Sequence, residues 1–268
     1  MIILNQTLNY LDLSSLITKH FKPNLNTNFF LTEDESKYLL ENKKLFYLED
    51  NNLFLFKKRA ADYLCYYYIS DFSDSSILNT TFETITEPVV VEIPYKSSNT
   101  KISNVLDFFD NLGFKTILCR ERYKISALDN SSSLDSNICY AKEEDLSTIS
   151  KILNTTYNIH TGCVPEDNLL LKDITNQKII ISKFDNEIVG ILHFENSPKK
   201  AEIRHIVVLE EYRNKNIASS LIDFYHSIIQ NKANAVVWVS KDNLIAKKLY
   251  EKKGYLKDSF SSYVLMKG

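Results

Sequence analysis

Glycine and cysteine are both scarce in this sequence, with five and four residues among 268. The cysteines stand far apart and form no Cys-x-x-Cys pair, which argues against a zinc site or a disulfide framework and indicates free thiols. No apolar run approaches the roughly 20 residues that span a bilayer, and the start has no basic leader with a small-residue cleavage site. We therefore expect a cytoplasmic protein that uses no metal and no membrane.

Charge and length narrow the class further. The formal net charge of −2 does not suit a general nucleic-acid binder, because phosphate contacts need clustered Lys and Arg. The apolar share of 44% is that of a soluble globular protein, and 268 residues suffice for two domains. Up to residue 136 the chain has 14 Lys and Arg against 18 Asp and Glu, whereas the remainder has 18 against 16. This favours the second part as host to an anionic ligand.

A polar, serine-rich segment at residues 126–137, "SALDNSSSLDSN", divides the chain. It has little to bury, so we expect a linker between a first domain at 1–130 and a second at 137–268. On both sides, runs with strand character alternate with stretches of helical spacing, which predicts a mixed α/β layer fold. Within it, "KIIISKFDNEIVGILHFE" is expected to form a hairpin that turns at Asp185 and Asn186.

The two parts share a weak internal repeat. "VVVEI" followed by "FFDNLGF" in the first part parallels "AVVWV" followed by "LYEKKGY" in the second, with Phe109 matching Tyr250 at a period of 141 residues. In each part the helical stretch ends at a glycine, Gly113 and Gly254. The repeat indicates two copies of one domain.

The segment "EEYRNKNIASSL", residues 210–221, follows a predicted strand and begins a predicted helix. Free N–H groups at a helix start, together with the helix dipole, form a site for phosphate. Such a turn needs a residue with positive φ or without a side chain, which is why glycine is usual. Asn216 stands at this place, and asparagine is the residue other than glycine that best tolerates the conformation. Taken alone, the segment suits a phosphate site and a solvated charged turn equally.

The order of elements around this segment resembles the GNAT superfamily of acyl-CoA-dependent N-acetyltransferases over residues 137–268. The first family motif, Arg/Gln-x-x-Gly-x-Gly/Ala, is matched by Arg213, Asn214, Lys215, Asn216, Ile217 and Ala218. The second places an asparagine seven residues before a tyrosine and then a Gly-aromatic pair, as do Asn243, Tyr250, Gly254 and Tyr255. The resemblance implies a GNAT fold, with a central mixed, mostly antiparallel sheet flanked by helices, and the repeat suggests two tandem GNAT-like domains.

The resemblance also implies where acetyl-CoA would bind. Its pyrophosphate would lie on the backbone N–H groups of residues 214–219, which end at Ser219, beside Arg213. The pantetheine arm would pair with the backbone of Ile206, Val207 and Val208, where the central strand splays from its neighbour, and Asn243 would contact the arm. The N–H of Val208 would polarise the thioester carbonyl as an oxyanion hole does. No metal is implied.

Tyr250 and Glu202 are the candidate acid and base. In the family an amine that has lost its proton attacks the thioester, and Tyr250 would protonate the departing CoA thiolate. The alternative is a core aromatic with its hydroxyl at the rim. Glu202, in "AEIRHIVV", matches the base of the histone-acetyltransferase branch, and strand alternation would place it on one face with Arg204 and Ile206. The alternative is a carboxylate in water or paired with Arg204.

Four further residues are weaker candidates. Glu195 and His205 are runners-up for the base, although a single histidine on a strand is more often structural. His160 and Cys163 lie in "YNIHTGCVPED", where the family forms its acceptor pocket. A plain loop explains them equally well, since no residue in the sequence orients a Cys–His nucleophile there.

The first part departs from the family pattern. Phe109 replaces the tyrosine, Ile102 replaces the asparagine, and residues 1–88 contain no matching turn. We therefore expect a degenerate GNAT-like domain that walls the acceptor cleft or mediates a homodimer. The whole chain is predicted to transfer an acetyl group from acetyl-CoA to the primary amine of a small molecule or peptide. A non-catalytic acyl-CoA sensor or scaffold, and a protein N-terminal or lysine acetyltransferase, are the alternatives.

Overall fold

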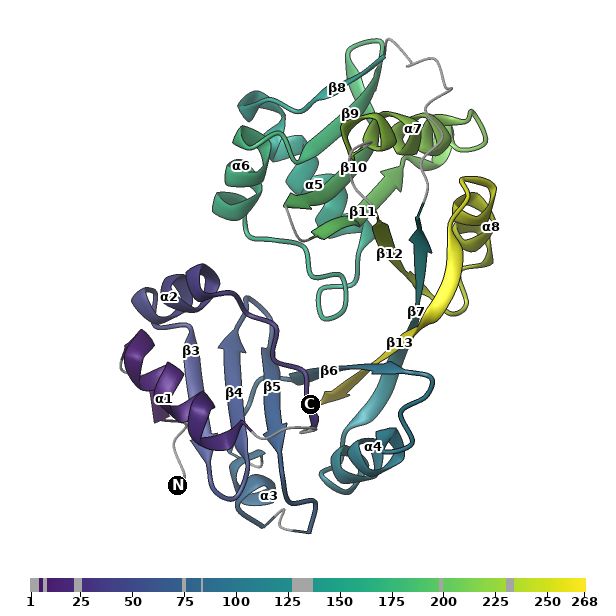
Figure 1. Cartoon of the computed structure of the whole chain (residues 1–268). Helices are drawn as coiled ribbons and strands as arrows, with labels where there is room; N and C mark the ends of the chain where they lie inside the picture. The colour runs from purple at the N-terminus through teal and green to yellow at the C-terminus, as the bar shows by residue number, and fades with distance from the viewer. Residues whose placement is uncertain are drawn as a thin grey trace. The chain divides into compact units, whose positions relative to one another are not determined.

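The computed structural model describes residues 5–6, 9–21, 26–73, 76–82, 84–126, 137–197, 200–229 and 234–268. The chain divides into two compact units, the first made of Met1–Cys119 with Phe260–Gly268 and the second of Arg120–Ser259 (Figure 1). The expected boundaries, 1–130 and 137–268, differ from this division at both ends of the second unit. The expected linker lies, from residue 127 to 136, outside the described residues.

The first unit is a sheet covered on both faces. The helices α1 and α2 pack on one face, while α3 and α4 pack on the other. Its sheet has the order β1-β3-β4-β5-β6-β13, with β2 on β5, and only the β5–β6 pair among these is parallel. The elements are β1 Asn5–Gln6, α1 Tyr10–His20, β2 Asn26–Thr27, α2 Glu33–Glu41, β3 Leu45–Glu49, β4 Leu53–Lys58, β5 Tyr63–Ile69, α3 Ser76–Phe82, β6 Val89–Lys96, α4 Ile102–Asn111 and β7 Lys115–Ile125.

The second unit repeats this layout, with α5 and α6 on one face and α7 and α8 on the other (Figure 1). Its sheet has the order β8-β9-β10-β11-β12-β7, in which only β11–β12 is parallel. Each unit thus has the mixed, mostly antiparallel sheet that the resemblance implied. The elements are β8 Ile138–Tyr140, α5 Leu146–Thr156, α6 Asp167–Thr175, β9 Ile179–Phe184, β10 Glu187–Ser197, β11 Lys200–Val208, α7 Ile217–Ile229, β12 Ala235–Ser240, α8 Leu244–Lys252 and β13 Leu256–Lys267.

Each sheet ends on a strand from the other half of the sequence. Residues 120–125 of β7 pair with β12 of the second unit, and residues 260–267 of β13 pair with β6 of the first. The final segment was expected to close the second domain, and for residues 260–267 this is corrected. The reason is burial, because Leu265 belongs to the hydrophobic core of the first unit.

Local turn geometry confirms the expected hairpin and shows the same helix end in both units. Asp185 and Asn186, between β9 and β10, have φ values of 47° and 67°, as a tight two-residue hairpin turn requires. At the ends of α4 and α8 the N–H groups of Phe114 and Tyr255 each donate, at 3.0 Å, to the carbonyl five residues earlier. The glycine before each has φ near +85°, which only glycine adopts freely, so both helices end in the same αL cap.

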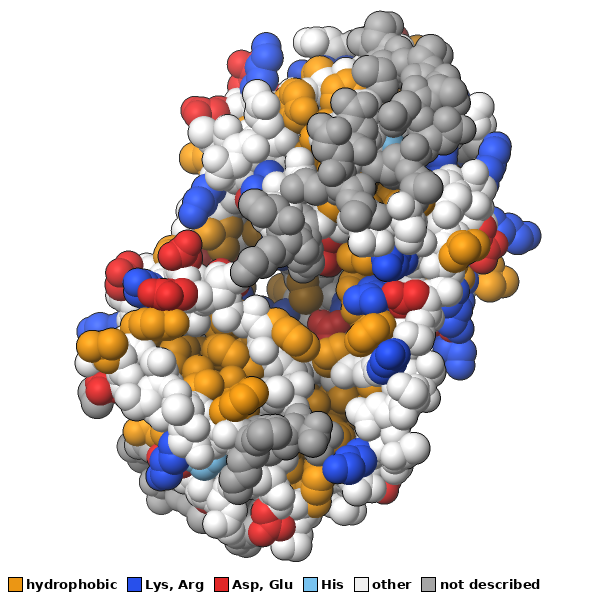
Figure 2. Space-filling view, viewed as in Figure 1, with side chains coloured by type: hydrophobic (Ala, Val, Ile, Leu, Met, Phe, Trp, Pro, Cys, Tyr) orange, Lys and Arg blue, Asp and Glu red, His pale blue; other side chains and the backbone are white. Residues whose placement is uncertain are grey.

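The described helices include none that is both long and apolar enough to cross a membrane. Acidic and basic side chains are spread together over the face in view in Figure 2. This distribution agrees with a net charge of −2.

Candidate functional site

The turn before α7 has the conformation of an anion-binding turn. Asn214 and Asn216 have φ values of 63° and 62°, in the left-handed region where glycine is usual. The first helical hydrogen bond runs from Ser220 N–H to Asn216 O. The N–H groups of residues 217–219 therefore lie in the first turn of α7 and have no acceptor within the helix. The conformation expected of Asn216 is confirmed, and its use for phosphate stays a prediction.

Gly190 holds this turn close to the sheet. A Cβ added to Gly190 on β10 would lie 2.8 Å from Ile217 Cγ2, so a side chain at this position would push the start of α7 outward.

Two exposed cations flank the turn. Arg213 lies 3.9 Å from Glu210, and the Lys215 ammonium lies 4.8 Å from the centre of the Tyr212 ring. Neither contact withdraws its cation from solvent, so both cations remain available to an anion.

The central strand β11 separates from β12 beside this turn. The parallel ladder joins only Glu202 to Val236 and Ile203 to Val237, while β11 continues to Val208. On the other side β11 stays paired with β10 up to Val208. The expected splay of the central strand is therefore present.

The backbone of β11 exposes polar groups to the gap where β11 separates from β12, which is called the splay below. Leu209 N–H donates to Val189 O on the β10 side at 2.9 Å. Because backbone groups alternate in an antiparallel ladder, those of Ile206 and Val208 point away from β10, toward β12. Within the described residues, Val208 N–H has no ladder partner on that side. It can therefore donate a hydrogen bond to a ligand oxygen.

Tyr157 fills the splay at Ile206. Its hydroxyl lies 3.0 Å from both the N and the O of Ile206, so it accepts one hydrogen bond and donates the other. The Tyr157 ring packs edge-on against His205 with centroids 4.9 Å apart, and burial raises the pKa of the phenol to about 12. Tyr157 was not predicted as a site residue, since a tyrosine at the end of a helix carries no pattern of its own.

A β-bulge at Arg204 changes the face on which Glu202 lies. His193 pairs with His205 but Phe194 pairs with Ile203, which leaves Arg204 as the extra residue. Glu202 pairs with Glu195 and therefore lies on the α5–α6 face, whereas Ile206 packs against the core beside α7. The expectation that Glu202 and Ile206 share a face is wrong, because the bulge reverses the alternation between them.

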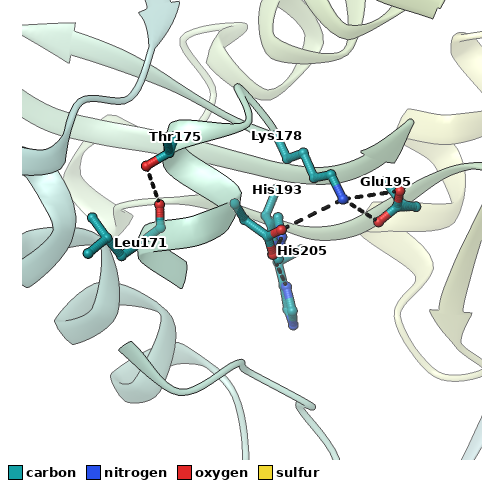
Figure 3. Close-up of polar contacts among 7 residues, drawn as sticks. Leu171, Thr175, Lys178, His193, Glu195 and His205 are labelled. Carbon is teal, nitrogen blue, oxygen red and sulfur yellow. Dashed lines mark hydrogen bonds and ion pairs between the residues drawn. The ribbon is translucent and has the colours of Figure 1, made fainter. Parts of the chain in front are cut away.

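A buried polar chain crosses the α5–α6 face (Figure 3). Asp173 Oδ2 lies 3.0 Å from His193 Nε2, and the Nδ1 atoms of His193 and His205 lie 3.1 Å apart. Gly162 O lies 2.8 Å from His205 Nε2, so this nitrogen carries the ring proton and donates to the carbonyl. Burial lowers the pKa of His205 to about 3. The chain thus ties the loop after α5 to β11 with both nitrogens of His205 in use.

Glu195 is held by a lysine. Lys178 Nζ lies 3.0 and 3.2 Å from the two Glu195 oxygens and 3.8 Å from Asp173. Figure 3 shows the lysine side chain pointing to Glu195. The lysine charge offsets the repulsion expected between Glu195 and its cross-strand partner Glu202. Glu195 is therefore engaged in an ion pair.

The two motif residues of α8 differ in exposure. Tyr250 is 2% exposed. Burial raises the Tyr250 pKa well above its usual value, and the nearby phenols of Tyr157 and Tyr255 raise it further. Asn243 is exposed and caps α8, because its Oδ1 accepts from Ala246 N–H at 3.0 Å. Only its Nδ2 remains to donate to a ligand.

The loop of His160 and Cys163 is a compact turn. Asn158 O accepts from Gly162 N–H at 2.7 Å, and the Asn158 side chain accepts from His160 N–H at 2.9 Å. Cys163 is exposed with φ of 53°. Groups of three or more metal-ligating side chains are absent from the described part of the chain.

The corresponding splay in the first unit is filled by an amide. The parallel pair β5–β6 ends at Cys65 and Val91, and beyond it lies the side chain of Asn28, which is 3% exposed. Asn28 donates to Cys65 O at 3.1 Å and to Glu92 O at 2.8 Å, and accepts from Tyr67 N–H at 2.8 Å. This one side chain therefore joins both strands.

Comparison with known proteins agrees with this geometry. Residues 146–255 match the family model described as the acetyltransferase (GNAT) family. No curated protein is significantly similar to the chain in sequence. The fold is similar to three solved structures: a GNAT-family acetyltransferase from Colwellia psychrerythraea (14% identical, TM-score 0.58, 99% of each chain covered); a GCN5-related N-acetyltransferase from Sphaerobacter thermophilus (11%, 0.60, 99% of this chain and 95% of that one); and a tandem GNAT protein from the clavulanic acid biosynthesis pathway (8%, 0.56, 96% and 87%).

At these identities the likenesses show the fold, which is a mixed α/β GNAT fold with a large mixed sheet flanked by helices. The family-model match concerns sequence, and it lies on the unit that has the anion-binding turn and the open strand edge. The chain therefore contains a domain of the GNAT acetyltransferase family over residues 146–255.

Proposed function

We propose that this chain is an acetyl-CoA-dependent N-acetyltransferase whose active site lies in the second unit. The observation that carries the proposal is the unpaired edge of β11, which leads directly into the turn at residues 213–216. Coenzyme A has a diphosphate, which suits the free N–H groups and cations of the turn. It also has an arm that ends in the thioester, whose carbonyl oxygen suits the N–H of Val208, which has no ladder partner on the β12 side. One ligand would thus use both features.

The proposed reaction is a direct transfer within a ternary complex. The amine nitrogen attacks the thioester carbonyl carbon, a C–N bond forms, and the C–S bond breaks to release CoA thiolate. Val208 N–H stabilises the oxyanion that forms on the carbonyl oxygen. The amine must first lose a proton, because a lysine-like ammonium has a pKa of about 10.4.

Tyr250 is the proposed acid. Its raised pKa keeps the proton on the phenol until a thiolate is formed. The phenol of Tyr157 contributes to the raised pKa of Tyr250. Asn243 would donate from Nδ2 to a carbonyl of the arm.

Glu202 is the proposed base and would act through water. It lies where the β11–β12 ladder ends, but on the α5–α6 face, so it cannot reach the amine along the strand edge. Glu195 is less suitable because Lys178 holds both of its oxygens. His205 is less suitable because it is 3% exposed and both ring nitrogens have partners.

The first unit is proposed to be a degenerate GNAT-like domain that does not bind CoA. Asn28 already uses the backbone groups at its splay. The N–H groups of Ser70 and Asp71, after β5, donate to the side chain of the buried Asn52.

A cytoplasmic location is supported by the four free cysteines, since oxidising compartments favour disulfides.

Calorimetric titration of the full chain with acetyl-CoA tests the proposal. The whole chain is needed because a fragment starting at residue 137 would lack β7, which pairs with β12. Micromolar binding, followed by CoA release with members of an amine panel, is the expected result. Absence of binding would contradict the function, and binding without transfer to any amine would favour a non-catalytic acyl-CoA sensor.

A further inference from the structure

We propose that Tyr157 limits the length of the acyl group and so makes the site selective for acetyl and propionyl donors. The inference rests on the proposed function and adds the residue that sets the longest acyl group the site accepts. It follows from the double hydrogen bond between the Tyr157 hydroxyl and the backbone of Ile206.

The direction of the ligand follows from the chain. The anion-binding turn comes after the C-terminal end of β11, so a CoA anchored there runs back along the strand edge. It meets Val208 before it meets Ile206. The thioester carbonyl takes the free N–H of Val208, and the acyl chain extends toward Ile206 and the Tyr157 hydroxyl.

The available space fits a short acyl group. Val208 and Ile206 are two residues apart, which is roughly 6.6 Å along a strand. A carbon atom keeps about 3.5 Å from the hydroxyl oxygen, which leaves about 3 Å, the size of a methyl group. A two-carbon acyl group ends in this space, whereas a chain of four or more carbons meets the phenol.

Tyr157 is held as a fixed stop. Its hydroxyl is satisfied by one residue, so it has no unpaired group that favours leaving. The loop that follows is fastened by His205 to Gly162 O at 2.8 Å and by Arg120 to Thr161 O. A Cβ on Gly162 would lie 2.5 Å from Tyr157 Cβ, so the glycine lets this loop fold against the tyrosine.

Calorimetry of the full chain with CoA and with acetyl-, propionyl-, butyryl- and hexanoyl-CoA tests the proposal. Without a stop, longer chains should bind more tightly, because each buried methylene adds favourable free energy. We expect the wild-type protein to bind hexanoyl-CoA at least about 10-fold more weakly than acetyl-CoA. Tyr157→Ala should bring the two affinities within about threefold of each other.

Two further variants sharpen the outcome. Tyr157→Phe keeps the ring and removes one atom, so it should improve propionyl- and butyryl-CoA binding and leave hexanoyl-CoA weak. Tyr140→Ala is the matched control, because the Tyr140 ring packs on Phe224 in the same unit and it should keep the wild-type preference. Equal affinity of the wild-type protein for all acyl lengths, or an unchanged preference in Tyr157→Ala, would overturn the proposal. If no variant binds even CoA, the acetyltransferase function itself fails.

Discussion

The two units share one fold but treat the opening between their parallel strands differently. In the first unit Asn28 is hydrogen-bonded to β5 and β6 together, through three backbone groups. In the second unit Tyr157 is hydrogen-bonded to β11 alone, through Ile206. The first splay is therefore closed by the protein, whereas the second keeps a free N–H at Val208.

The turns after β5 and after β11 also differ in whether their backbone N–H groups have partners. After β5, the side chains of Asn52 and Asp71 accept the N–H groups of residues 70, 71 and 73. After β11, two asparagines with positive φ turn the chain, and the first turn of α7 keeps its N–H groups free. The first unit thus satisfies with its own side chains the backbone groups that the second unit leaves free, which is the basis of the proposal that it binds no CoA.

The largest expected effect comes from placing a negative charge at the anion-binding turn of the second unit. Ser219→Glu puts a carboxylate beside the diphosphate site. Two charges about 4 Å apart near a protein surface repel by about 4 kcal/mol, which would weaken acetyl-CoA binding nearly 1,000-fold. Ser73→Glu, in the corresponding exposed loop of the first unit, should change nothing in the same titration. A similar loss in both variants would mean that the anion-binding turn of the second unit is not where the diphosphate binds.

Asn28→Ala tests whether the hydrogen bonds of Asn28 between β5 and β6 stabilise the first unit. The change leaves three buried backbone groups without partners, and we expect a loss of about 3 kcal/mol in the free energy of unfolding. Tyr157→Phe frees only Ile206 and should cost about 1 kcal/mol. Denaturant unfolding of both variants gives the comparison. Equal losses would show that the two side chains have the same structural role.

Tyr250→Phe should lower kcat about 100-fold, because it removes the proposed proton donor. The affinity for CoA should be nearly unchanged, since only one atom is lost. Tyr255→Phe is the control, because its hydroxyl bonds His226 at 3.0 Å within the core. Unchanged kcat of Tyr250→Phe in a chemistry-limited assay would exclude the acid role. At the matching place the first unit has Phe109, which supports loss of catalysis there.

Local features were predictable from the sequence, whereas the long-range ones were not. The hairpin turn at Asp185, the glycine caps and the positive φ of Asn216 depend on neighbouring residues, and the structure confirms all three. The bulge at Arg204, the exchanged strands and the contact of Tyr157 with Ile206 depend on residues far apart in sequence. None of these pairings leaves a periodic pattern, so the face of Glu202 was wrong and Tyr157 was missed.

Acid should destabilise the second unit before the first. Burial lowers the pKa of His205 to about 3 and that of His226 to about 4, below the unfolded value of about 6.5. Between these values the unfolded chain binds more protons, so stability falls as pH falls below 6.5. At pH 5 each histidine contributes a loss of about 2 kcal/mol.

Hydrogen exchange by mass spectrometry at pH 7 and pH 5 can resolve the two units. Peptides of the second unit should lose protection first, and the fluorescence of Trp238, the single tryptophan, should change with them. His226→Gln should reduce the difference, because an amide can bond Tyr255 without titrating. Simultaneous loss in both units would contradict the assignment to these histidines.

The smallest expected effect concerns the residue that departs from the family motif. Asn216 adopts φ of 62°, which costs an asparagine little and a glycine nothing. Asn216→Gly should therefore keep acetyl-CoA affinity within about threefold of wild type, or tighten it, since the change is below 1 kcal/mol. Asn216→Val is the matched change in the other direction, because a β-branched residue resists positive φ and should distort the turn. Marked loss of binding in the glycine variant would mean that the asparagine side chain, rather than the backbone of the turn, contacts the ligand.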